Sequence, residues 1–169
     1  MTRAALALGG NVGDVAAAFA LALQTLRVHP DVVLVARSVV YRTKPWGVTD
    51  QPDFLNMAAL IDTRLPPRDL LALCLSIERE GGRVRDLRWG PRRIDIDVIT
   101  YGDETIDEPD LTVPHPRAAE RAFVLAPLAE IAPDLEIAGT RVDALLASLG
   151  SDGIGRDEGA DAILTGAGL

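Results

Sequence analysis

Residues 54–62 read Phe-Leu-Asn-Met-Ala-Ala-Leu-Ile-Asp, and their pattern decides how we expect the chain to fold. Successive side chains of a β-strand point to opposite faces of its sheet. One face of a strand here collects a purely apolar set, namely Leu55, Met57, Ala59 and Ile61. Phe54 and Asn56 point to the other face. The stretch therefore predicts a strand with one face against helices and an uncovered face that carries polar groups.

The flanking sequence predicts further strands, which alternate with helices. Runs rich in apolar and β-branched residues predict further strands, and apolar residues at helical spacing predict helices. We expect strands at 3–8, 32–41, 54–62 and 94–101, and helices from Asp14 to His29 and from Pro66 to Gly81. The order predicts an α+β fold with a ferredoxin-like βαββαβ core, in which two helices cover one face of a four-stranded antiparallel sheet.

The remainder of the chain is expected to be less regular. Shorter helical pieces are predicted at 123–131 and 142–149. Residues 151–169 contain five glycines and few large apolar side chains, which indicates a loosely held C-terminal tail. We therefore expect a single domain over residues 1–150, followed by this tail.

Composition restricts the class of protein. The chain has 169 residues, 48% of them hydrophobic, which suits one compact domain. It lacks the roughly 20 consecutive apolar residues of a membrane span, and its start lacks a signal-peptide pattern. A single cysteine, Cys74, rules out internal disulfides. We expect a monomeric cytoplasmic protein that binds neither membrane nor nucleic acid.

The charges are unevenly distributed. The net charge is −8, yet six of the 17 basic residues are arginines within residues 79–93. That window carries +4, and the rest of the chain carries −12. A duplex-binding protein would be basic over a wide face. One short basic segment in an acidic chain favours a compact anion as the ligand.

Asp95 and Asp97 form the sharpest chemical signal. Two residues apart on a strand, they share a sheet face, which is costly without a nearby cation. Carboxylate oxygens suit Mg²⁺, which also binds phosphate oxygens and water. The arginines just upstream match phosphate geometry, so the combination favours phosphoryl transfer. Alone, the acids could be a solvated strand edge and the arginines a solvated loop.

Other candidates are weaker. Trp89 could stack on a base, cap a pocket or fold onto the sheet. Glu78 ends a helix, where an acid is unfavourable, so a ligand role is open. His115 could hydrogen-bond a phosphate or a backbone group. The segment from Gly9 to Asp14 lacks the Walker and dinucleotide patterns and is interpreted as a tight turn.

Together these segments resemble the hydroxymethyl-dihydropterin pyrophosphokinase family, over nearly the whole chain up to about residue 149. The most specific part runs from Gly82-Arg83-Val84-Arg85 to Arg88-Trp89-Gly90-Pro91-Arg92-Arg93-Ile94-Asp95-Ile96-Asp97. Further matches are Tyr41-Arg42-Thr43, Asp50-Gln51-Pro52-Asp53-Phe54-Leu55-Asn56 and Leu111-Thr112-Val113-Pro114-His115, while Gly9-Gly10-Asn11 differs by one residue from the family's usual Gly-Ser-Asn.

The resemblance implies Mg²⁺-dependent transfer of the β,γ-diphosphate of ATP to the hydroxymethyl oxygen of 6-hydroxymethyl-7,8-dihydropterin, giving AMP and the pterin diphosphate, in folate biosynthesis. It implies two Mg²⁺ ions on Asp95 and Asp97, and a catalytic set of Arg83, Arg92, Asp95 and Asp97. The implied ATP-binding residues are Glu78, Arg85, Arg88, Trp89, Val98, Thr112, His115 and Arg121. The implied pterin-binding residues are Thr43, Pro45, Trp46, Phe54, Asn56 and Phe123.

Some positions depart from the commoner family forms. These are Lys44-Pro45-Trp46, Phe54 in place of a frequent tyrosine, Asp110 where some members carry an arginine, and Pro116 where some have an aromatic residue. Two other classes stay open. An RNA-binding module on the same plan would carry aromatic residues where this chain has Asp95 and Asp97, and a regulatory small-ligand domain would bind without turnover.

Overall fold

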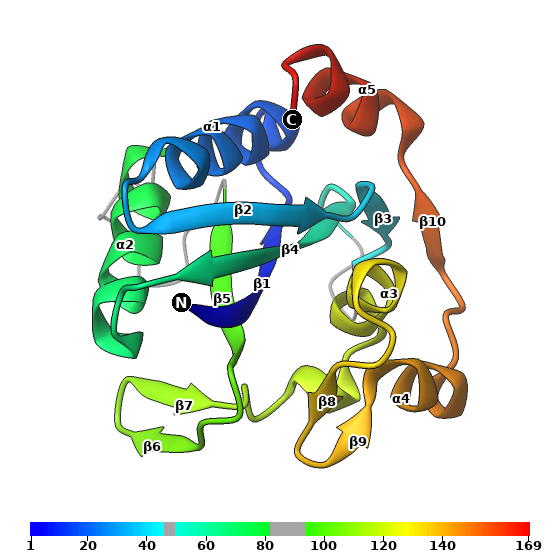
Figure 1. The fold of residues 1–169 in the computed structure, drawn as a ribbon. Helices are drawn as coiled ribbons and strands as arrows, with labels where there is room; N and C mark the ends of the chain where they lie inside the picture. The colour runs from blue at the N-terminus through cyan, green and yellow to red at the C-terminus, as the bar shows by residue number, and fades with distance from the viewer. Residues whose placement is uncertain (46–49, 82–93) are drawn as a thin grey trace.

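The computed structural model describes residues 1–45, 50–81 and 94–169 (Figure 1). The first part of the chain forms β1 (Thr2–Gly10), α1 (Val15–Val28), β2 (Val32–Arg37), β3 (Tyr41–Thr43), β4 (Phe54–Thr63), α2 (Pro67–Glu80) and β5 (Asp95–Tyr101). The second part forms β6 (Ile106–Glu108), β7 (Leu111–Val113), the short 3₁₀ helix η1 (Ala118–Glu120), α3 (Ala122–Ile131), β8 (Glu136–Ile137), β9 (Thr140–Arg141), α4 (Val142–Leu149), β10 (Ile154–Arg156) and α5 (Glu158–Gly166).

The α+β class and the antiparallel sheet are confirmed, but the sheet is wider than the four strands expected. It has six strands, in the order β10-β3-β4-β1-β5, with β2 also paired to β4. The predicted strand 32–41 is interrupted after Arg37, where Ser38 Oγ accepts a hydrogen bond of 2.9 Å from Ala58 N. Because of this break, β2 and β3 pair with opposite ends of β4.

The apolar face of the sheet is the one expected from strand parity. Leu55, Met57, Ala59 and Ile61 all lie in one buried core with the inner faces of α1 and α2. Asp14 begins α1 as predicted, its side chain accepting from Ala17 N at 3.0 Å. Phe19 and Leu23 on α1 are fully buried. Two amphipathic helices thus cover this face.

The opposite face is not uncovered along its whole length, which corrects the expectation. Ala58 and Leu60 of β4 pack with Leu125 and Leu128 of α3 in a second core. Ile99 of β5 joins them, because it lies two residues after Asp97 and so shares its sheet face. The helices α3 and α4 occupy this side in Figure 1. The open part of the face is therefore reduced to the end that carries Asn56 and Asp97.

The C-terminal residues 151–169 also differ from the loosely held tail expected. β10 pairs with β3 as a sheet strand, and α5 packs beside α1 (Figure 1). Ala160 and Leu164, four residues apart on one face of α5, are buried in the main core. The high glycine content suggested a loosely held tail. The helix is nevertheless docked, because two apolar side chains on one face and an N-cap are enough to hold a short helix. Within the described ranges, no helix is long and apolar enough to cross a membrane.

Candidate functional site

An open pocket of about 780 Å³ lies where the uncovered end of the sheet meets the start of α3. The described residues lining it are Ala7, Leu8, Gly9, Gly10, Asn11, Thr43, Lys44, Gln51, Phe54, Asn56, Asp95, Asp97, Arg117, Arg121, Phe123 and Val124. Seven residues predicted from the sequence are among them: Thr43, Phe54, Asn56, Asp95, Asp97, Arg121 and Phe123. Folding thus brings together residues from strands and loops that are far apart in the chain.

An amide and two aromatic rings characterise one part of this lining. Asn56 is buried, and its Nδ2 donates a hydrogen bond of 3.1 Å to Thr43 Oγ1, which fixes the side chain across the β3–β4 pair. Phe54 and Phe123 line the same pocket from β4 and α3. An oriented amide with nearby ring faces can bind a flat, polar heterocycle by hydrogen bonding and stacking.

Asp95 and Asp97 form the acidic part of the pocket. They lie opposite Gly9 and Ala7 of β1, so both belong to the pocket face of β5. Asp97 is half-exposed, with 46% of its side-chain surface accessible. Glu78 is buried at the end of α2, and its Oε1 accepts 2.8 Å from Ile96 N. This hydrogen bond fixes the backbone at Ile96, between the two carboxylates. Glu78 therefore has a structural role next to the site.

His115 lies beside Asp97 without lining the pocket. Its Nε2 is 3.9 Å from Asp97 Oδ2, and its Nδ1 accepts 3.2 Å from Arg117 N. In the neutral ring the proton is therefore assigned to Nε2, on the side of Asp97. Burial lowers the pKa of His115 from its usual value, and this outweighs the opposing attraction of Asp97. A neutral donor thus faces the carboxylate.

Cations complete the described lining. Arg121 was predicted, and its guanidinium carbon lies 5.7 Å from the centre of the Phe123 ring. Lys44 and Arg117 also line the pocket. Lys44 was expected only as a departure from the family forms, and Arg117 was not predicted, although its position two residues after His115 was an available signal. Three cations near two carboxylates suit a polyanionic ligand held together with a metal ion.

Several other predicted site residues do not line the pocket or are not among the residues that the structure describes. The Val98 side chain is in the core against the helices, and Thr112 pairs with Asp107 in the β6–β7 hairpin. Pro45, Glu78 and His115 are described but are not part of the lining. Predictions on Trp46, Arg83, Arg85, Arg88, Trp89 and Arg92 fall outside the described residues. Asp110, a departure from the family, pairs with Arg68 at the start of α2.

The carboxylates fit a magnesium ion only in part. Asp95 and Asp97 provide hard oxygen donors on one face, as Mg²⁺ prefers. Within the parts of the chain that the structure describes, no cluster of three or more histidine, cysteine, aspartate or glutamate residues could hold a metal ion. The donor set thus suits an ion that takes its remaining ligands from substrate oxygens and water, rather than a closed structural site.

Fold and pocket define a small α+β domain whose pocket brings an amide and aromatic rings next to carboxylates and cations. Residues 5–133 match the family model described as 7,8-dihydro-6-hydroxymethylpterin-pyrophosphokinase (HPPK). The chain belongs to this family, and it is an ATP-dependent diphosphotransferase of folate synthesis. The resemblance drawn from the sequence is therefore confirmed.

Curated relatives agree with this assignment over most of their length. A 2-amino-4-hydroxy-6-hydroxymethyldihydropteridine pyrophosphokinase of Methylorubrum extorquens is 56% identical over 94% of this chain and 100% of its own. Enzymes of the same name from Pseudomonas aeruginosa and Bacillus subtilis are 45% and 46% identical, over 94% and 82% of this chain and 98% and 83% of theirs.

Solved structures show the same fold at low sequence identity. Wild-type HPPK-DHPS of Plasmodium falciparum, crystallised with SDX-DHP, superposes with a TM-score of 0.73 at 15% identity. The match covers 92% of this chain and 47% of the other, so this chain spans about half the length of that protein.

Proposed function

We propose that this chain transfers the β,γ-diphosphate of ATP to the hydroxymethyl oxygen of 6-hydroxymethyl-7,8-dihydropterin and releases AMP. The observation that carries the proposal is the single pocket that combines Phe54, Asn56 and Phe123 with Asp95 and Asp97. A pterin is a flat heterocycle with donors and acceptors on its edge, which is what an oriented amide and aromatic rings select. The family assignment supports the same substrates.

The two parts of the pocket would then have different roles. Phe54, Phe123 and Asn56 orient the pterin so that its hydroxymethyl group faces the carboxylates. Thr43 holds the Asn56 amide in place. Arg121 and His115 Nε2 donate to phosphate oxygens close to Asp97. Positioning and charge neutralisation of this kind account for most of the catalysis in phosphoryl transfer.

Asp95 and Asp97 would hold two Mg²⁺ ions, whose charge would neutralise phosphate oxygens and lower the proton affinity of the substrate hydroxyl. The alcohol oxygen attacks the β-phosphorus in line and gives up its proton to the Asp95 and Asp97 carboxylates, the bond between the β-phosphorus and its bridging oxygen to the α-phosphate breaks, and AMP leaves. We assign Arg83 and Arg92 to the transferred group. Arg85, Arg88 and Trp89 are assigned to ATP, and Trp46 and Pro45 to the pterin, by resemblance to the family.

The proposal is tested by AMP release from ATP, Mg²⁺ and the pterin alcohol. The natural chain should release AMP only when all three are present. Asp97→Asn keeps the shape of the side chain but removes its charge, so turnover should fall by about a thousandfold or more, as for other groups that act directly on the transferred phosphoryl group. Asp103→Asn, an exposed acid in the turn after β5, is the matched control and should keep full activity.

Two outcomes would contradict the proposal. If the natural chain releases no AMP, the substrate pair is wrong. If Asp97→Asn is as active as the control, Asp97 is not a metal ligand. The cytoplasmic location and the monomeric state stay predictions, and sedimentation of the purified chain tests the latter.

A further inference from the structure

We propose that the C-terminal segment, residues 154–169, is a positioning element for the pterin part of the pocket, and that Asp157 is the residue through which it acts. The inference rests on the proposed function for the identity of the ligand. The segment lies beyond residue 133, where the match to the family model ends.

The segment covers an edge that would otherwise be open. β3 has three residues and pairs with β4 on one side, where Thr43 lies opposite Phe54 and Tyr41 opposite Asn56. On its other side it pairs with β10, where Ile154 lies opposite Thr43. Figure 1 shows β10 running past β3 toward α5. Because so short a strand has few hydrogen bonds of its own, the second partner limits its motion.

Asp157 connects the segment to β3 through three sets of contacts. Its backbone N donates 2.8 Å to Val40 O, just before β3. Its Oδ1 accepts 2.9 Å from Ala160 N and so caps α5. Its Oδ2 accepts from Arg42 of β3, from Nε at 2.8 Å and from Nη2 at 2.5 Å. Only 13% of its side chain is exposed.

Arg42 carries this connection toward the pterin. It is flanked by Tyr41 and Thr43 on β3, and its Nη1 lies 3.5 Å from Asp53 Oδ2. Asp53 immediately precedes Phe54, which lines the pocket. The Asp157–Arg42–Asp53 chain of charges thus joins the C-terminal segment to both strands that present Thr43, Phe54 and Asn56.

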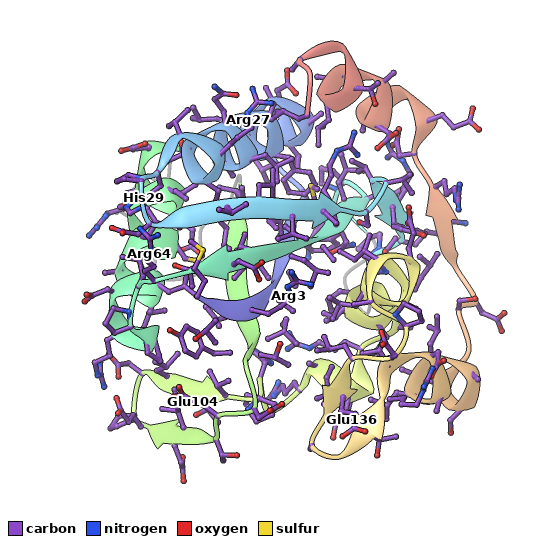
Figure 2. All side chains as sticks on the ribbon, in the orientation of Figure 1. Arg3, Arg27, His29, Arg64, Glu104 and Glu136 are labelled. Carbon is purple, nitrogen blue, oxygen red and sulfur yellow. The ribbon has the colours of Figure 1, made fainter. Side chains whose placement is uncertain are left out.

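The far end of the segment is fixed to the body of the protein. Arg37 of β2 donates to Asp161 Oδ1 at 2.6 Å and to Leu169 O at 3.0 Å. Arg27 of α1, labelled in Figure 2, donates to Gly168 O at 2.8 Å. Leu164 is fully buried. The C-terminal segment is therefore itself fixed to β2, α1 and the core, so it can restrain β3.

Kinetics of single variants test the proposal. Asp157→Ala removes the cap and the ion pair, while Arg42→Ala removes the ion pair and leaves the cap intact. If the free energy of one lost cap or charged hydrogen bond is drawn from pterin binding, the affinity falls by about three- to tenfold. We expect the KM for the pterin to rise by that factor, with kcat and the KM for ATP within twofold of the natural chain. Asp152→Ala, an exposed acid in the loop before β10, is the control and should change nothing.

Asp157→Asn separates the two contacts, because asparagine caps a helix as well as aspartate but forms no ion pair. Its KM for the pterin should match that of Arg42→Ala. Hydrogen exchange should become faster at residues 41–43 in Asp157→Ala without a general loss of protection.

The inference is overturned if the pterin KM of both Asp157→Ala and Arg42→Ala equals that of the control, or if the KM values for pterin and ATP rise together. Unchanged exchange at residues 41–43 in Asp157→Ala also overturns it. An inactive natural chain would instead refute the proposed function, and the exchange measurement would still test whether Asp157 holds β3.

Discussion

Gly9 lies opposite Asn56 in the β1–β4 pair and leaves room for its side chain. A Cβ at Gly9 would stand 3.1 Å from Asn56 Oδ1, tighter than ordinary van der Waals contact, so the amide would have to shift by a few tenths of an ångström. Both residues line the pocket. Any side chain at position 9 would therefore press on the Asn56 amide in the wall of the pocket.

Gly9→Ala should displace the Asn56 amide and raise the KM for the pterin about tenfold, as expected when a buried polar group loses its hydrogen-bond geometry. Gly166→Ala is the matched control, because a Cβ there meets nothing within 4 Å. Steady-state kinetics and thermal unfolding of both variants check the prediction. An unchanged KM in Gly9→Ala would show that Asn56 tolerates the shift.

Arg117 is a second residue whose importance only the structure reveals. Its side chain lines the pocket, and its backbone N holds the His115 ring. Because alanine keeps the backbone bond, Arg117→Ala removes the charge alone. We expect the KM for ATP to rise about five- to tenfold, the usual cost of one charged contact to phosphate.

Arg64→Ala is the control for Arg117, since Arg64, labelled in Figure 2, is exposed on the loop before α2 and is not among the residues lining the pocket. The increase caused by Arg117→Ala should shrink as salt is raised, because screening weakens the contact in the natural chain. Equal KM values for the two variants at low salt would exclude Arg117 from ATP binding.

At the scale of elements, α5 depends on a titratable cap. The Ala160 N–H bond is the main cause of the lowered pKa of Asp157, and the Arg42 guanidinium lowers it further. A carboxyl group whose pKa is lowered by folding stabilises the protein above its unfolded pKa, near 3.9. That stability is lost as pH falls through the lower, folded pKa.

Asp157→Asn should therefore lower Tm at pH 7, and the difference from the natural chain should shrink below about pH 4. Thermal unfolding at a series of pH values measures it. Asp152→Asn serves as the control without a pH-dependent difference. A gap that stays constant down to pH 2 would mean that the charge of Asp157 does not stabilise α5.

The β6–β7 hairpin is tied to α2 by a cluster of charged side chains. Arg68, in the first turn of α2, donates to both Asp110 and Glu108. Burial of these groups is slight, so the cluster contributes little to stability. Its effect is to hold Asp110 against the start of α2.

At the scale of the whole molecule, Cys74 reports on the integrity of the core. It is fully buried on α2. Burial, with smaller contributions from the charges of Glu78 and Asp97, raises the pKa of its thiol to about 12. A thiolate is the reactive form, so the native chain should resist thiol reagents at pH 8 and react fully once unfolded.

Labelling by an aromatic disulfide, with and without guanidinium, tests this prediction. The native rate should track global opening and so rise in destabilised variants such as Asp157→Asn. Labelling of the native chain as fast as the unfolded chain would mean that α2 opens independently of the rest of the core.

Local patterns in the sequence determined most of the secondary structure. Alternation in residues 54–62 set the buried face of β4, and Asp14 set the start of α1. The pair Asp95 and Asp97 was visible because strand parity is a local property. The resemblance to the family predicted that Phe54, Asn56 and Phe123 belong to the same site. Strand parity alone could not establish that these three residues meet in one pocket.

Tertiary structure decided the features that depend on backbone hydrogen bonds and on distant neighbours. The pairing of β10 with β3 has no side-chain signal, because an edge strand is defined by its free N–H and C=O groups. Arg117 and Gly9 joined the site only when β1 and the start of α3 came together. The sequence by itself therefore determined the elements, the family and the paired acids. Only the tertiary structure decided the width of the sheet, the docking of the C-terminal segment and the full lining of the pocket, since these arise from contacts between residues that no local period relates.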